Sequence, residues 1–407
     1  MQLTRISSVA ILIITVWGCS QQPARQVRRT TPTRAAPVKP APATQPALAI
    51  VYGPYLQAPA ADGMTICWMT NRKCVSRVEY AEGDSEQYVT AISSHFGLID
   101  ADKTYHAVRL SNLKPATSYT YRVVSKEMVE FQAYKVVFGQ TVCSGPARFT
   151  TLDLRKQRSS FIVLNDRHEK IDELKAALAG VDFKDLDLVF YNGDMVNSAT
   201  GVQQVMRCVV APSAFANVIP FIYVRGNHDT RGPGARSLMN WFPTQSGRLY
   251  YSFDHAGVHF VVLDCGEDKR DSDREYFGLV NFRPYMAEEA RWLKEEVRSE
   301  AFRRAKFRVV IVHIPPYVSG EPKFAQGEWI IDNFCPLLEE AGADLMLCGH
   351  LHVFAEYAPQ PPLRSYPLIL GGTETVIRVN ITGDELEVCS LRDDGTAMRS
   401  PLKIRRK

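Results

Sequence analysis

The stretch Phe161-Ile162-Val163-Leu164-Asn165-Asp166-Arg167-His168 joins a compact apolar run to an aspartate and a histidine. An apolar run of this kind predicts a buried strand. In an extended segment, side chains two residues apart project to the same side, so Asp166 and His168 are expected to reach one ion. Because Asp and His bind borderline divalent metals, the stretch predicts a buried strand with metal ligands at its end.

Similar apolar runs recur through the C-terminal half of the chain and predict further buried strands, at residues 188–191, 221–224, 260–263, 309–312 and 345–347. Between them, residues 288–305 place apolar side chains on one face among charged neighbours, which predicts a helix. Alternating strands and helices favour a layered α/β domain, whose ligands bind beyond the strand ends. Segments 266–285 and 315–329 are expected to form loops near such a site.

Polar motifs follow these predicted strands, and together they supply Asp194, Asn227, His228, Asp229, His313, His350 and His352. The last two repeat the spacing of Asp166 and His168. Asp194 can bridge two cations, because a carboxylate has two oxygens and paired metals lie ~4 Å apart. Each motif alone arises by chance, but their order predicts one two-metal site, of the kind that hydrolyses phosphate esters.

The chain before residue 152 has a different pattern. Short runs rich in β-branched and aromatic residues predict strands at 64–69, 75–80, 106–110, 119–124 and 135–138, and hence a β-sandwich. A turn is expected at residues 71–73, between the first two of these strands. Cys67 and Cys74 flank this turn and are the nearest candidates for a disulfide.

The N-terminus is typical of an exported protein. Arg5 is followed by an apolar run over residues 9–17 and then by Gly18-Cys19, which resembles a bacterial lipoprotein signal. That resemblance implies cleavage after residue 18, acylation of Cys19 and a lipid-anchored protein on the periplasmic or surface side of the envelope. Plain secretion and an uncleaved anchor remain alternatives.

Residues 21–49 hold six prolines, seven alanines and five basic residues without an acidic one, which predicts an unfolded tether. The expected organisation is therefore a signal at 1–19, a linker at 20–49, a sandwich at 50–152 and the α/β domain at 158–407. The formal net charge of +4 on 407 residues is small, so no nucleic-acid-binding surface is expected.

Two regions of the chain resemble known protein families. Residues 53–57, 65–68 and 113–123 resemble the fibronectin type III-like domain that precedes the catalytic domain of purple acid phosphatases. From about Phe161 onward, the ordered motifs resemble the calcineurin-like metallophosphoesterase superfamily. This second resemblance implies a four-layer α/β/β/α sandwich.

The superfamily resemblance also implies roles for single residues. Asp166, His168 and His352 would hold one metal, Asn227, His313 and His350 the other, and Asp194 would bridge them. His228 would lie beside the phosphate without binding metal, and Asp229 would orient it. The purple acid phosphatases place a tyrosine where Asn197 stands and a glycine where His168 stands, so no iron-tyrosinate chromophore is expected.

The implied cofactors are two divalent or mixed-valence ions, with Mn, Fe and Zn all possible by ligand type. The implied reaction is in-line attack of a metal-bound hydroxide on a small phosphate ester. A phosphomonoesterase of the acid phosphatase kind is favoured over a phosphodiesterase of the same superfamily. The alternative from another class is a surface-tethered binding protein whose metal site is structural or inactive.

Overall fold

The computed structural model describes residues 46–316 and 325–406. Cys19, the predicted signal and most of the predicted linker lie outside these residues, as do residues 317–324 of the second predicted loop. No helix within 46–316 or 325–406 combines the length and the apolar character that crossing a bilayer requires.

The N-terminal domain is a β-sandwich built around one long strand, β2 (Gly63–Glu82). The N-terminal half of β2 pairs with β1 (Ile50–Ala60) and β6 (Lys103–Leu110), and its C-terminal half pairs with β7 (Ser118–Gln132). The remaining strands are β3 (Val89–Ala91), β8 (Lys135–Cys143) and β9 (Ala147–Thr150), with a small hairpin of β4 (Ser94–His95) and β5 (Leu98–Ile99). Trp68, Tyr121 and Phe149 are buried together in the core of this sandwich.

The prediction of a turn at residues 71–73 is wrong. β2 runs through this segment, and an irregularity between Met69 and Cys74 lets the strand leave one set of partners for the next. The polar residues at 71–73 therefore mark a change of pairing partner rather than a chain reversal. Since Cys67 and Cys74 lie on one extended strand, they are too far apart for a disulfide, and both are free thiols.

The C-terminal domain holds two six-stranded sheets. In the first, the parallel strands β12 (Phe221–Val224), β11 (Leu186–Asn192) and β10 (Arg158–Leu164) are followed by the antiparallel β19 (Thr375–Thr382), β20 (Glu385–Arg392) and β21 (Leu402–Arg405). In the second, the order is β13 (Tyr251–His255), β14 (Val258–Val262), β15 (Phe307–Ile311), β16 (Leu345–Cys348), β18 (Leu368–Leu370) and β17 (Ala355–Tyr357). Strands β14, β15, β16 and β18 of the second sheet are parallel.

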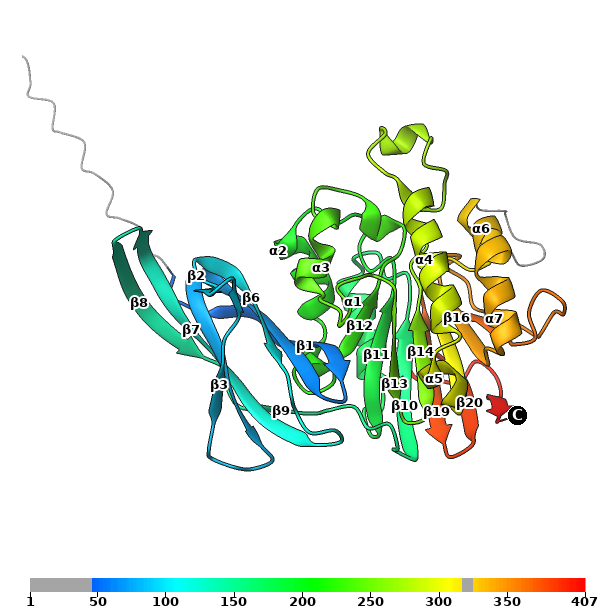
Figure 1. The fold of residues 1–407 in the computed structure, drawn as a ribbon, viewed down its shortest axis with the longest axis horizontal. Helices are drawn as coiled ribbons and strands as arrows, with labels where there is room; N and C mark the ends of the chain where they lie inside the picture. The colour runs from blue at the N-terminus through cyan, green and yellow to red at the C-terminus, as the bar shows by residue number, and fades with distance from the viewer. Residues whose placement is uncertain (1–45, 317–324, 407) are drawn as a thin grey trace, which may run out of the picture. The chain divides into compact units, whose positions relative to one another are not determined.

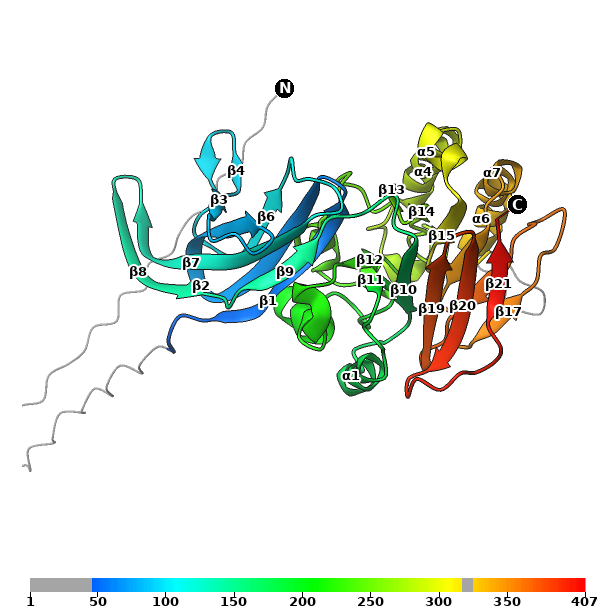
Figure 2. The same ribbon diagram turned by 90° about the horizontal axis from the view of Figure 1, so that it is seen from below.

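Side chains alternate between two cores along each central strand. In β10, Phe161 and Val163 face the second sheet, whereas Ile162 and Leu164 pack toward α1 (Ile171–Ala179). The outer face of the second sheet is covered by α4 (Phe282–Glu296), α5 (Glu300–Arg304), α6 (Ala325–Asn333) and α7 (Cys335–Ala341). Figures 1 and 2 show α1 on one side of the two sheets and α4, α5 and α7 on the other. The predicted four-layer α/β/β/α sandwich is thus confirmed.

The helix predicted at residues 288–305 differs from the structure at both ends. It begins earlier, at Phe282, so that residues 282–285 form the first turn of α4 rather than the end of a loop. It also breaks before α5, where Ser299 has an extended backbone and its side chain accepts a hydrogen bond from the Phe302 amide. A serine that caps a new helix in this way competes with continuation of the previous one.

Candidate metal centre

The predicted ligands come from loops that follow the central strands of both sheets. Asp166 and His168 follow β10, Asp194 follows β11, and Asn227 follows β12. His313 follows β15, and His350 and His352 follow β16. Because the carboxyl ends of these parallel strands meet at one edge of the domain, ligands from both sheets converge there.

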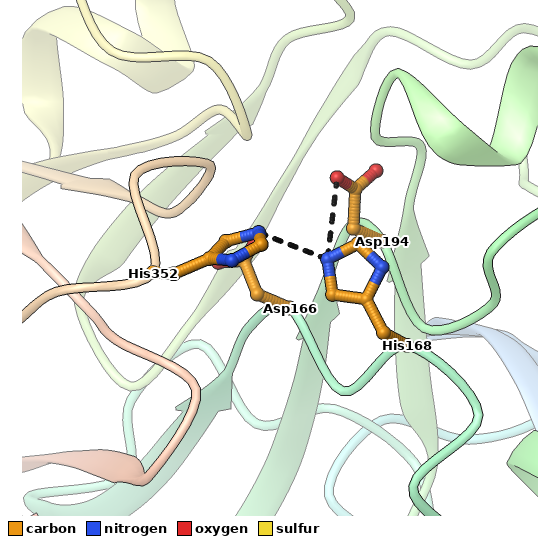
Figure 3. Close-up of side chains that lie close together, drawn as sticks. All are labelled: Asp166, His168, Asp194 and His352. Carbon is orange, nitrogen blue, oxygen red and sulfur yellow. Dashed lines mark hydrogen bonds and ion pairs between the residues drawn. The ribbon is translucent and has the colours of Figure 1, made fainter.

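Seven predicted ligands therefore meet at one place, and six of them form two overlapping groups. The first group is Asp166, His168, Asp194 and His352, and the second is Asp194, His313 and His350; within each group the candidate ligand atoms lie within 4.8 Å of one another. Figure 3 shows the first group converging on a common centre. Asp194 belongs to both groups, as a bridging carboxylate requires.

Contacts inside the first group suit a shared cation. The Nε2 atoms of His168 and His352 lie 2.9 Å apart. His352 Nε2 lies 3.6 Å from an Asp166 oxygen, and His168 Nε2 lies 3.9 Å from an Asp194 oxygen. In the second group, His313 Nε2 lies 3.2 Å from the same Asp194 oxygen, Oδ2.

Asn227 tests whether a cation fits the second group. Its side-chain oxygen lies 3.0 Å from Nδ1 of His350 and 3.2 Å from Oδ2 of Asp194. A carboxylate oxygen is only an acceptor, and a ring nitrogen without a hydrogen offers its lone pair, so in the absence of a cation the amide would be better placed with its NH2 group toward these two atoms. A cation between the three atoms makes this orientation favourable, because it would be bound by all of them. The donor set of carboxylate, imidazole and amide groups therefore fits a second metal ion.

Five of the seven ligands have a left-handed backbone. The φ angles are 52° at Asp166, 45° at His168, 53° at Asp194, 77° at His350 and 60° at His352. The expectation that Asp166 and His168 share a side because their segment is extended is therefore wrong, as is its repetition at His350 and His352. The chain turns sharply after each strand, and these turns aim the ligands inward. Such strained residues cluster at functional sites.

Close packing of backbone against ligands explains the glycines in these motifs. A Cβ at Gly226 would overlap Asp194, and a Cβ at Gly193 would overlap the His313 ring. Gly349 is packed against Asp166 and Asn165. At these positions glycine is required because the ligand occupies the space of a side chain.

Buried polar groups behind the ligands fix their orientation. His313 Nδ1 donates to the Asn192 carbonyl at 2.7 Å, which leaves Nε2 as the ring atom that faces the carboxylates. The Asp166 carboxylate accepts a hydrogen bond from the His350 amide at 2.9 Å. Asn192 also donates to Asn165 at 2.9 Å. The sequence motifs contain no signal that singles out Asn165 or Asn192 beyond their position next to ligand motifs.

The electrostatics of the site favour bound positive charge. Burial raises the pKa of Asp166 to about 7. His313 is buried as well, but the adjacent Asp194 and Asp166 carboxylates outweigh that effect and raise its pKa to about 10. Burial lowers the pKa of His168 to about 4 and that of His350 to about 3, so these rings stay neutral and keep a lone pair for a metal. Carboxylates that hold a proton on a buried imidazole would accept a metal ion in its place.

Asp229 makes other contacts than the resemblance implies, whereas the implied place of His228 beside the metals stays a prediction. His228 Nδ1 lies 3.0 Å from the Asn197 carbonyl, which therefore orients the ring. The buried Asp229 carboxylate accepts hydrogen bonds from the Asp194 amide at 3.0 Å, the Gly226 amide at 2.8 Å and the Tyr223 hydroxyl at 2.8 Å. Asp229 thus ties the loop after β11 to the loop after β12. It positions Asp194 rather than His228.

Two arginines near the site carried no role in the sequence-based prediction. Arg167, between the first two ligands, is buried and forms a two-pronged ion pair with Asp393, at 2.7 and 3.0 Å. This pair fastens the ligand loop to the turn after β20. Arg231 lies two residues after Asp229, and its guanidinium approaches His228. The sequence signal available for both was a basic residue inside a ligand motif, for Arg167, or just after one, for Arg231.

The predicted loop at residues 266–285 borders the site, although it ends at residue 281. Its first part contributes Glu267, which forms an ion pair with Arg231 at 2.9 Å. Farther along it, Phe277 and Leu279 are exposed. The loop therefore reaches the site through charged residues, and its exposed apolar residues lie beyond them.

Comparisons with known proteins agree with this architecture. Residues 159–354 match the family described as calcineurin-like phosphoesterase, and residues 52–151 match the purple acid phosphatase N-terminal domain. Purple acid phosphatase 21 of Arabidopsis thaliana is 24% identical over 317 residues, which cover 73% of this chain and 64% of that protein. Probable purple acid phosphatase 20 of the same plant is 24% identical over 322 residues, covering 73% and 66%. The chain thus spans just under two thirds of the length of these relatives.

Solved structures show the same fold. Purple acid phosphatase PPD1 from yellow lupin (Lupinus luteus) seeds superimposes with a TM-score of 0.65 at 14% identity, covering 87% of this chain and 74% of that one. PhoD gives a TM-score of 0.56 at 12% identity, covering 85% and 91%. The chain therefore has the fold of these structures, with a region that matches the calcineurin-like phosphoesterase family and, ahead of it, a region that matches the purple acid phosphatase N-terminal domain.

Proposed function

We propose that this protein is a hydrolase of phosphate esters whose centre holds two metal ions, and that phosphomonoesters are its favoured substrates. The observation that carries the proposal is the position of Asp194 in both ligand groups. A single structural ion would need one closed set of ligands. Two groups that share a carboxylate are instead the arrangement that paired-metal hydrolases use.

In this proposal, Asp166, His168 and His352 hold one ion, Asn227, His313 and His350 hold the other, and Asp194 holds both. Two ions bound there would supply positive charge to a phosphate and lower the pKa of water. A carboxylate has two oxygens, so Asp194 could bind both ions. In the metal-free chain, burial alone would raise its pKa, but the neighbouring His313 lowers the pKa below its usual range. Mn, Fe and Zn all suit these ligands.

His228 is the proposed catalytic group that does not bind metal. Its Nδ1 faces the Asn197 carbonyl, and its Nε2, which lies 3.2 Å from Arg231 Nη1, is the ring atom we expect to interact with a phosphate oxygen or a leaving group. Asp229 supports catalysis by positioning Asp194, with its carboxylate held by two backbone amides and Tyr223. Residue 197 is an asparagine, whose side-chain NH2 donates to the His168 carbonyl at 3.3 Å, so no phenolate stands at this position. With iron bound, we therefore expect no tyrosinate absorption band.

Two further candidates use the same chain differently. A phosphodiesterase would employ the same ligands with a substrate that carries one negative charge less. A tethered binding protein would hold metal without turnover.

From the sequence of residues 1–49 we also propose export with an acylated Cys19, which mass spectrometry of the mature N-terminus can test.

The experiment compares metal-stripped protein with protein resupplied with Mn, Zn or Fe, using paired chromogenic phosphomonoester and phosphodiester substrates. Asp194→Ala should lose metal and nearly all turnover, because both ligand groups lose their shared member. His228→Ala should keep two ions per chain while kcat falls by a factor of about 10² or more. Asp172→Ala, at a fully exposed position on α1, is the matched control for both measurements.

The outcomes separate the three candidates. Metal-dependent turnover that is higher for the monoester supports the proposal, and the reverse preference supports the phosphodiesterase. Two bound ions without turnover of either ester, with any of the three metals, would favour the binding protein.

A further inference from the structure

Arg231 lies at the rim of the candidate site and touches two of its residues. Its Nη1 atom lies 3.2 Å from Nε2 of His228, the ring nitrogen that faces away from the Asn197 carbonyl. Its Nη2 atom lies 3.1 Å from the Asn227 side-chain nitrogen when the amide oxygen faces the other ligands; both groups are donors, so this is a packing contact and not a hydrogen bond. The side chain is 30% exposed, so the guanidinium borders both the ligand set and solvent.

A buried carboxylate holds this guanidinium in one orientation. Nε and Nη2 of Arg231 donate to the two oxygens of Glu267, each at 2.9 Å. Glu267 is itself fixed, because it accepts hydrogen bonds from the Thr230 hydroxyl at 2.7 Å and the Tyr276 hydroxyl at 3.0 Å. With two prongs of the fork engaged, the Nη1 end is the one that points to His228.

Stability of the loop alone does not explain the pair formed by Arg231 and Glu267. An arginine fork held by a carboxylate that has its own buried partners is costly to desolvate, and such pairs add little net stability. A guanidinium keeps its proton at all working pH values, so Arg231 is charged throughout. The arrangement therefore delivers a permanently charged donor, fixed in direction, beside the proposed catalytic histidine.

We propose that Arg231 is a substrate-binding residue whose Nη1 donates to a non-bridging oxygen of a phosphate monoester, and that it sets the preference for monoesters over diesters. This inference rests on the proposed phosphoesterase function. A terminal monoester phosphate has three non-bridging oxygens and carries up to two negative charges. A diester has two such oxygens and one charge. An added charged donor therefore benefits the monoester more.

The test uses the metal-loaded full chain and compares Arg231→Gln, Arg231→Lys and Glu267→Gln. For Arg231→Gln, kcat/KM for the chromogenic monoester should fall by about 10-fold to 100-fold, the range for a lost charged hydrogen bond. The fall for the diester should be under about threefold. Arg231→Lys should recover part of the loss, because lysine keeps the charge but not the fork. Glu267→Gln should give an intermediate, monoester-selective loss.

Binding of inorganic phosphate gives a readout that does not depend on turnover. Calorimetric titration of the metal-loaded chain should show phosphate binding weakened by about tenfold or more in Arg231→Gln. Arg236→Gln is the matched control, since Arg236 lies nearby on the 3-10 helix η4 (Ala235–Ser237) and donates to the Leu279 carbonyl instead of the site. It should leave phosphate binding unchanged.

Several results would overturn the inference while leaving the proposed function intact. Equal loss for monoester and diester in Arg231→Gln, with unchanged phosphate binding, would mean that Arg231 only positions His228. The same conclusion would follow if Arg231→Gln had no effect once His228→Ala was present, as a double-mutant cycle would reveal. If the unaltered, metal-loaded chain binds phosphate in an Arg231-dependent way but turns over neither ester, Arg231 is a phosphate-binding residue as inferred, whereas the proposed function and the ester preference fail.

Discussion

At the scale of single residues, the site depends on backbone that passes where a side chain would normally be. Asp194 takes its position from three neighbours: the loop glycines, the Asp229 carboxylate and the His228 amide, which donates to Asp194 Oδ1 at 2.8 Å. The space next to Gly226 is occupied by the Asp194 carboxylate. A methyl group at residue 226 would therefore push Asp194 away from the other candidate ligands.

We accordingly expect Gly226→Ala to lower metal affinity by about tenfold or more, which is typical when the support of a ligand is disturbed. The measurement is the number of metal ions per chain after equilibrium dialysis, by elemental analysis. Gly201→Ala is the matched control, because a Cβ there meets no atom within 4 Å. Two tightly retained ions in Gly226→Ala would show that Asp194 can move without loss of the site.

At the scale of secondary-structure elements, buried ionic contacts fasten helices and turns to the sheets. Arg167 joins the ligand loop after β10 to the turn after β20. His259 on β14 does the same for the outer layer, with Nδ1 at 2.7 Å from Asp254 on β13 and Nε2 at 3.1 Å from Glu296 at the end of α4. The imidazole is buried between two carboxylates, which suits its charged form.

This contact makes stability depend on pH. Burial alone would lower the pKa of His259, but hydrogen bonds to Asp254 and Glu296 outweigh it and raise the pKa above its unfolded value of about 6.5. Because the folded state binds the proton more tightly, the stabilisation is fully present below about pH 6.5 and is lost as pH rises through the folded pKa.

His259→Gln should therefore reduce the free energy of unfolding more at about pH 6 than at about pH 9, by a difference on the order of 1 kcal/mol. Urea denaturation at both pH values provides the measurement. His95→Gln, at an exposed position, should stay within about 0.5 kcal/mol of the parent at each pH. A loss that is equal at both pH values would mean that His259 contributes by packing and not by its charge.

At the scale of the whole described molecule, the sandwich and the α/β domain share one hydrophobic cluster. Tyr55 of β1 is buried, stacks on Phe221 with ring centroids 5.7 Å apart, and donates to the Trp241 carbonyl at 2.6 Å. Gln57 donates to the Phe221 carbonyl at 2.9 Å, and Tyr121 to the Asn217 carbonyl at 2.9 Å. Residues 47–407 accordingly form a single compact unit.

Because both domains rely on this cluster, we expect residues 47–407 to unfold in one cooperative transition. Tyr55→Ala should lower the free energy of unfolding by about 3–5 kcal/mol, as for other large aromatic residues removed from a core. Scanning calorimetry would show one transition at a lower temperature. Tyr134→Ala is the matched control because Tyr134 is fully exposed. Separate transitions, with only the sandwich transition shifted by Tyr55→Ala, would contradict the expectation.

Much of the fold could be predicted because burial is written into local sequence. Runs such as residues 161–164 are apolar at every position, since β10 is covered on both faces, and this predicted the layered domain correctly. The strand pairing of the N-terminal domain was harder to predict from the sequence. β2 changes partners without reversing direction, and no local pattern distinguishes a change of partner from a turn.

The candidate site, too, was determined partly by the sequence and partly by the tertiary structure. The sequence determined which residue types follow each strand, and therefore which ligands meet, because the carboxyl ends of parallel strands share an edge. Only the tertiary structure decided how they meet. The left-handed backbone at Asp166 and His350, the role of Asp229 in positioning Asp194, and the pairing of Arg231 with Glu267 depend on segments distant in the chain. Such contacts exist only after the loops have packed together, so no local sequence pattern encodes them.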